Sequence, residues 1–169
     1  MKKYNLLTII LFTSCSFTFA QSERFKKAEI SNRIEIEGDI NFAWIYLSNL
    51  GNLQNLVPST IQSSIATGYG IGSSVTLTLT NNKGIIKEEV IKLNNKTFQI
   101  TYKMTSSPLP IKNYVAGFAL KKIAVNKFEV AFDAKFKVQD INRKARLEAF
   151  NKLQLELLTN IKKKTDENK

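Results

Sequence analysis

The side chains that could act as acids or bases in this sequence are carboxylates, phenols and amines, because the chain contains no histidine. The candidates within the apolar segments are Glu88, Glu89, Tyr102, Lys103, Tyr114 and Asp133. Without histidine the chain lacks the commonest general base and the commonest zinc ligand. A single cysteine excludes an intramolecular disulfide and a thiolate metal cage. No nucleophile stands beside a base and no phosphate-binding loop occurs, so we expect neither a metal nor a cofactor.

Glu88 is the carboxylate whose sequence position most favours burial. Glu88 and Glu89 are neighbours on a predicted strand, so their side chains face opposite sides and cannot act as a pair on one substrate. Glu88 shares the parity of Ile86 and Val90, which predicts a partly buried side chain. Burial would raise its pKa unless a cation paired with it. An ion-paired, structural Glu88 is the alternative.

The candidate side chains lie on strands that form one antiparallel series. An alternating segment at 29–37 predicts the first strand, and two short helical segments follow it before Pro58. Between 61 and 138, alternating segments separated by Gly-rich and Asn-rich turns predict six further strands. From Asp140 the apolar residues recur every three or four positions, which predicts a long C-terminal helix. Its apolar stripe comprises Leu147, Phe150, Leu153, Leu157, Leu158 and Ile161.

The first twenty residues have the pattern of an export signal. Lys2 and Lys3 precede an apolar run at 6–12, and Ala20 ends a small-x-small cleavage motif. We therefore expect a signal peptide at 1–20, an N-terminal segment at 21–28, a single domain at 29–164 and a frayed tail at 165–169. The mature protein would be periplasmic or secreted. Cys15 leaves an alternative open, because residues 12–15 resemble a loose lipobox that would give a lipoprotein anchored through this cysteine.

Composition is that of one globular domain with a basic surface. The chain has 169 residues, of which 43% are hydrophobic, and its formal net charge is +11. The lysines are scattered along strand-like segments, with one run at 162–164, so we expect no nucleic-acid partner. Weak contact with an anionic membrane surface stays open. We expect a monomer or a weak dimer.

The order of one strand, two short helices, six strands and a long helix resembles the helix-grip fold of the SRPBCC (START-like) superfamily, in particular its polyketide cyclase/dehydrase-like lipid-transport branch. The resemblance covers about residues 34–160. One departure is Leu56, which stands where many relatives have a tryptophan. The segments that carry the resemblance are Ala43-Trp44, Leu50-Gly51-Asn52-Leu53, Leu56-Val57-Pro58, Gly70-x-Gly72, Thr76-Leu77-Thr78-Leu79, Ile86-Lys87-Glu88-Glu89-Val90 and Pro108-Leu109-Pro110 followed by Asn113-Tyr114.

This resemblance implies an α+β fold in which a curved, antiparallel, seven-stranded sheet wraps around the C-terminal helix and leaves a cavity between them. The implied function is binding of a small or medium-sized hydrophobic ligand, such as a lipid or a polyketide-like or aromatic molecule. Two alternatives stay open: a cyclase or dehydratase that uses the same cavity, and a ligand-free structural or interaction protein of the envelope. Glu88 is the candidate polar group of the cavity. The side chains expected to line it are Phe98, Tyr102, Tyr114, Phe118, Phe132, Phe150, Leu153 and Leu157.

Overall fold

A computed structural model of the chain describes residues 24–169. The predicted signal peptide, with Cys15, lies outside the described residues. The elements in chain order are β1 (Lys26–Glu37), α1 (Ile40–Ser48), the 3-10 turn η1 (Leu50–Asn52), α2 (Leu53–Leu56), β2 (Ile61–Thr67), β3 (Ser74–Leu79), the 3-10 turn η2 (Thr80–Asn82), β4 (Ile85–Asn94), β5 (Gln99–Ser106), β6 (Ile111–Ala124), β7 (Lys127–Val138) and α3 (Asp140–Glu167). This order confirms the predicted succession of strands and helices.

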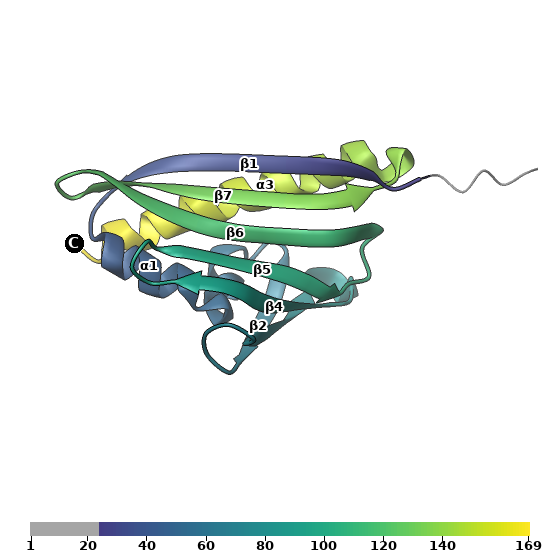
Figure 1. Cartoon of the computed structure of the whole chain (residues 1–169), viewed down its shortest axis with the longest axis horizontal. Helices are drawn as coiled ribbons and strands as arrows, with labels where there is room; N and C mark the ends of the chain where they lie inside the picture. The colour runs from purple at the N-terminus through teal and green to yellow at the C-terminus, as the bar shows by residue number, and fades with distance from the viewer. Residues whose placement is uncertain (1–23) are drawn as a thin grey trace, which may run out of the picture.

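The seven strands form one antiparallel sheet in the order β1-β7-β6-β5-β4-β3-β2 (Figure 1). Every strand from β2 to β7 pairs with its neighbour in the sequence, and β1 pairs with the last strand, from Lys26 opposite Val138 to Glu37 opposite Lys127. The predicted alternation is present in β3, where Val75, Leu77 and Leu79 are buried. The first and last strands of the chain therefore lie side by side in the sheet.

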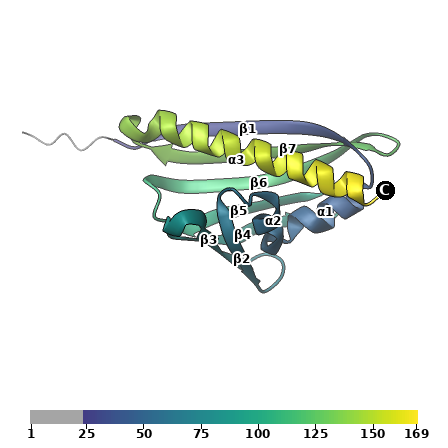
Figure 2. The ribbon, with the colours of Figure 1, turned by 180° about the vertical axis from the view of Figure 1, so that it is seen from behind.

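Helix α3 packs against one face of this sheet and runs diagonally to the end of the molecule where α1 lies (Figure 2). It contacts β1, β7, α1 and α2. Four residues of the predicted apolar stripe are buried, namely Phe150, Leu157, Leu158 and Ile161, whereas Leu147 and Leu153 are half-buried. The buried Gln154 lies on the same face. A curved antiparallel sheet that grips a long C-terminal helix is the helix-grip fold. No helix among residues 24–169 is long and apolar enough to cross a membrane.

Both ends of the domain are more extended than the sequence pattern predicts. Strand β1 begins at Lys26 rather than at residue 29, and Ala28 is buried within it. Helix α3 continues to Glu167, where we expected a frayed tail from 165. Thr165 in this last turn is buried, and its hydroxyl donates a hydrogen bond of 2.9 Å to the carbonyl of Ile161.

Gly38 makes room for that helix end. A Cβ atom at position 38 would lie 2.5 Å from the methyl carbon of Thr165, which is closer than carbon atoms can approach. The φ angle of Gly38 is +147°, a value that residues with a Cβ rarely adopt. A glycine at the β1–α1 junction therefore allows the last turn of α3 to pack against it.

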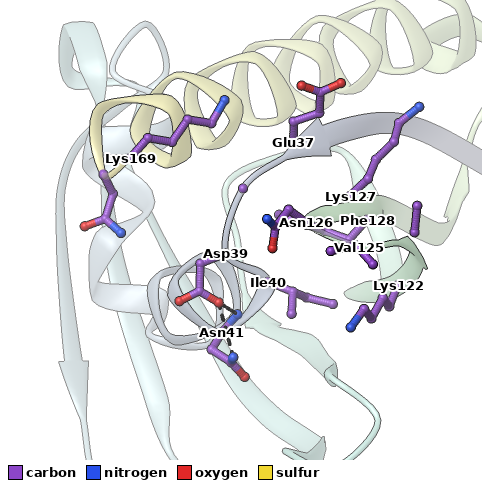
Figure 3. Close-up of a pocket in the computed structure, with 13 residues that line it drawn as sticks. Glu37, Asp39, Ile40, Asn41, Lys122, Val125, Asn126, Lys127, Phe128 and Lys169 are labelled. Atoms are coloured by element: carbon purple, nitrogen blue, oxygen red, sulfur yellow. Dashed lines mark hydrogen bonds between the residues drawn. The ribbon is translucent and has the colours of Figure 1, made fainter.

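Asp39 caps the N-terminus of α1. Its carboxylate accepts a hydrogen bond of 2.8 Å from the backbone N–H of Asn41 (Figure 3). Replacing Asp39 by alanine should lower the free energy of unfolding by about 1 kcal/mol, the usual contribution of a side-chain cap. Urea denaturation measures this change. Asp39→Ser keeps a capping oxygen and should retain most of the stability, whereas equal losses in both variants would contradict a capping role.

Candidate functional site

A cavity of about 500 Å³ lies between the sheet and the first half of α3. Strands β3, β4 and β5 form one wall, α2 and the start of β2 close one side, and the loop 108–110 closes another. Most lining side chains are apolar or aromatic, which is typical of sites for small organic ligands. The lining comprises Leu53, Val57, Ser59, Thr60, Ile61, Leu77, Leu79, Thr80, Lys83, Ile86, Glu88, Tyr102, Met104, Pro108, Leu109, Pro110, Tyr114, Phe132, Arg146, Ala149, Phe150 and Leu153.

Glu88 is the carboxyl group of this cavity, and it is 4% exposed. It lies on β4 between Val75 of β3 and Met104 of β5 in the register of the sheet. Within residues 24–169 no lysine or arginine forms a salt bridge with it, so the structure does not show the ion-paired carboxylate that was the alternative. Burial raises the pKa of Glu88 from 4.5 to about 8. At neutral pH the group is therefore mostly a neutral carboxylic acid.

Two buried phenols, Tyr102 on β5 and Tyr114 on β6, share the cavity with Glu88. Burial raises the pKa of Tyr102 well above 10, and the nearby Tyr114 and Glu88 raise it further. Burial, and then the nearby Glu88, raise the pKa of Tyr114 in the same direction. Both hydroxyls therefore keep their protons at physiological pH. With neutral Glu88 they give the cavity interior uncharged groups that donate and accept hydrogen bonds.

The cations of the lining are Arg146 on α3 and Lys83 on the η2–β4 turn. The Lys83 side chain belongs to an exposed residue, whereas Arg146 is half-buried. The Nε of Arg146 is buried and has no hydrogen-bond partner among the described residues. At neutral pH, where Glu88 is mostly protonated, the charged side chains of the lining are thus positive.

Six of the nine predicted site residues line this cavity. They are the candidate polar group and five aromatic or aliphatic side chains: Glu88, Tyr102, Tyr114, Phe132, Phe150 and Leu153. The rings of Tyr114 and Phe150 lie 5.3 Å apart, so a side chain from β6 meets one from α3 at the edge of the cavity. The sheet face and the helix stripe that the sequence pattern indicated do face each other there.

The other three predicted residues lie outside the lining. Phe118 is 2% exposed and packs against Phe132, with ring centroids 4.5 Å apart. Phe98, just before β5, has a φ angle of +50° and packs against Trp44, with ring centroids 5.9 Å apart. Leu157 is fully buried, one helical turn beyond Leu153. These side chains belong to the packed core, because the cavity extends only along the first half of α3.

Arg146 is the lining residue whose importance the sequence reasoning missed. It lies four residues before Phe150 and seven before Leu153, so it shares their helix face. That spacing was a usable signal for a charged group beside the apolar stripe. The wall formed by Leu77, Leu79 and the loop 108–110 was also not among the predicted site residues.

A wider hollow of about 740 Å³ lies beside the β1–α1 junction, the β6–β7 turn and the C-terminal residues (Figure 3). Its charged residues are exposed, apart from the half-buried Lys127. Two of its lysines already have partners, because Lys127 pairs with Glu35 and Lys169 pairs with Asp166. This hollow offers little of the enclosed apolar surface that favours an organic ligand. The smaller cavity under α3 is therefore the better candidate site.

Solved structures of similar architecture share this fold at low sequence identity. The protein XoxI from Bacillus cereus matches with a TM-score of 0.72 and 21% identity, covering 82% of this chain and 95% of its own. Norcoclaurine synthase from Thalictrum flavum, in complex with dopamine and hydroxybenzaldehyde, matches with a TM-score of 0.70 and 16% identity over 100% of this chain and 99% of its own. Major latex-like protein 151 from Panax ginseng gives a TM-score of 0.66 and 15% identity, covering 82% and 97% of the two chains.

These matches confirm the fold that the sequence analysis expected, a curved antiparallel sheet around a long C-terminal helix. No protein-family model matches the sequence, and no curated protein matches it.

Proposed function

We propose that this protein binds a small or medium-sized hydrophobic molecule in the cavity between its sheet and α3. The observation that carries this proposal is the combination of a cavity of about 500 Å³ with a mostly apolar lining and a small set of polar groups. Burial of apolar ligand surface there contributes roughly 25 cal/mol per Å² before the costs of association. The polar groups would then fix the orientation of the ligand.

The fold neighbours support a small-molecule function in general terms. Norcoclaurine synthase holds dopamine and hydroxybenzaldehyde in its solved complex, and it is an enzyme. Its identity to this chain is 16%, so its ligands and its reaction are not carried over. The likeness supports the use of this fold for binding organic molecules.

One observation favours a second candidate function, an enzyme that uses general acid catalysis. Glu88 is a buried carboxyl group that is protonated at neutral pH and lies in a cavity with two phenols. A cyclase or dehydratase would use such a group to protonate its substrate. In the described residues, however, Glu88 forms no hydrogen bond with Tyr102 or Tyr114 that would fix it as a catalytic set. Binding without chemistry is therefore the function we favour.

A bulkier side chain in the cavity should block binding. Leu153 is half-buried and lines the cavity. Leu153→Trp should weaken the binding of an apolar molecule by about tenfold or more, because the larger indole fills cavity space that the ligand would otherwise occupy. The probe is N-phenyl-1-naphthylamine, a neutral dye whose fluorescence rises in apolar surroundings. Titration of the protein into the dye gives the dissociation constant.

The control for this experiment is the same substitution at Leu155, which is 47% exposed on α3 and does not line the cavity. Leu155→Trp should bind the dye as the wild type does. Thermal denaturation confirms that both variants are folded. If the wild type shows no saturable dye binding, or if both tryptophan variants bind with wild-type affinity, the cavity is not the binding site.

A further inference from the structure

The charged groups around the cavity have one sign. Arg146 and Lys83 contribute two positive charges, and Glu88 is the only carboxyl group among the described lining residues. Glu88 does not neutralise them, because it forms no salt bridge and its pKa is raised by burial with no opposing effect of a cation. A cavity with this lining attracts an anion, not a cation.

Arg146 has hydrogen-bonding capacity that the described protein does not use. Its Nε–H is buried without an acceptor, which destabilises the protein unless a partner arrives. Other arginines are satisfied differently. Arg143, one turn earlier on α3, donates a hydrogen bond of 2.9 Å from Nη1 to the carbonyl of Lys27, and Arg33 lies 3.8 Å from carboxylate oxygens of both Glu129 and Asp133. Arg146 is the described arginine with a buried, unpaired donor at a cavity wall.

The residues that follow Arg146 on its helix face are apolar. Ala149, Phe150 and Leu153 continue the lining along α3 from the guanidinium. A molecule lying along this face would therefore meet a cation at one end and hydrophobic side chains along the rest of its length. That is the pattern expected for an amphipathic anion.

We propose that the ligand of this cavity is an apolar molecule with a carboxylate head, and that Arg146 binds this carboxylate while the apolar part lies against Phe150 and Leu153. The proposal rests on the proposed function and specifies its ligand class. The planar fork of a guanidinium matches the two oxygens of a carboxylate, and the resulting hydrogen bonds are charge-assisted. The buried Nε–H supplies one donor of that fork.

The test compares two ligands that differ in the head group: decanoic acid, which is ionised at pH 7, and decan-1-ol, which is neutral. Each ligand is titrated into the protein with bound N-phenyl-1-naphthylamine, and the loss of dye fluorescence measures its displacement. Decanoate should displace the dye at a concentration about tenfold lower than decan-1-ol does, a typical gain for a charge-assisted pair. Arg146→Gln should abolish this preference by weakening decanoate binding about tenfold while leaving decan-1-ol unchanged.

The matched control is Arg143→Gln, which removes a guanidinium from the same helix at a position outside the lining. It should keep the wild-type preference for decanoate. Equal displacement by the two ligands in the wild type, failure of both ligands to displace the bound dye, or an unchanged preference in Arg146→Gln would overturn the assignment of a carboxylate to Arg146. Absence of dye binding itself would instead refute the proposed function, so the two failures are distinguishable.

Discussion

Replacing Glu88 by glutamine is expected to stabilise the protein at alkaline pH and not at acid pH. In the folded state burial raises the pKa of Glu88 to about 8, while in the unfolded chain it returns to about 4.5. Below pH 4 both states are protonated and the carboxyl group causes no pH-dependent loss. As pH rises from 4.5 towards 8, only the unfolded state releases its proton, so wild-type stability falls.

The expected size follows from the difference in pKa. Each pKa unit corresponds to about 1.4 kcal/mol, so between pH 4 and pH 9 the stability of Glu88→Gln should increase relative to wild type by roughly 3–5 kcal/mol. Tyr102 and Tyr114 stay protonated over this range because their pKa values are raised above 10, so they do not obscure the effect. Urea denaturation of both proteins at intervals from pH 4 to pH 9 gives the difference directly.

Glu89 provides the control for this experiment, because it is the adjacent carboxylate on the opposite face of β4. It lies 3.3 Å from the Nζ of Lys103, and both side chains are more than one-third exposed. Glu89→Gln should change stability by about 1 kcal/mol or less, as expected for a surface ion pair. If the difference between wild type and Glu88→Gln is the same at pH 4 and pH 9, Glu88 is not an unpaired buried carboxyl group.

The sheet and its covering helix could be predicted because each element has its own hydrophobic period. In β3, Val75, Leu77 and Leu79 alternate with threonines, and the structure buries the three apolar side chains. In α3, Phe150 and Leu157 are seven residues apart and both are buried. Local period and turn residues were sufficient to order strands β2 to β7, since each of them pairs with its sequence neighbour, but they do not place β1 beside β7.

The position of the cavity could not be predicted in the same way. Parity assigns Tyr114 and Phe118 to the same face of β6, yet only Tyr114 lines the cavity. The difference depends on where α3 approaches the sheet, and that is set by tertiary contacts at both of its ends. One of these contacts, Thr165 against Gly38, joins residues far apart in the sequence and has no local pattern. The sequence therefore identifies the inward face but not which part of it is filled.

Phe118 tests this distinction between a packed core and a ligand cavity. It pairs with Phe132 across β6 and β7, and its ring lies 5.9 Å from that of Tyr102, so it supports two lining residues from outside the lining. Phe118→Ala should lower the free energy of unfolding by about 3–5 kcal/mol, as for large-to-small substitutions in cores. Under conditions where the variant is folded, its affinity for N-phenyl-1-naphthylamine should change by less than about threefold, because the side-chain volume that is removed lies outside the cavity.

Phe118→Leu, which keeps most of the side-chain volume, should recover most of the stability. A loss of dye affinity as large as that of Leu153→Trp, measured in a folded Phe118→Ala protein, would instead place Phe118 in the binding site.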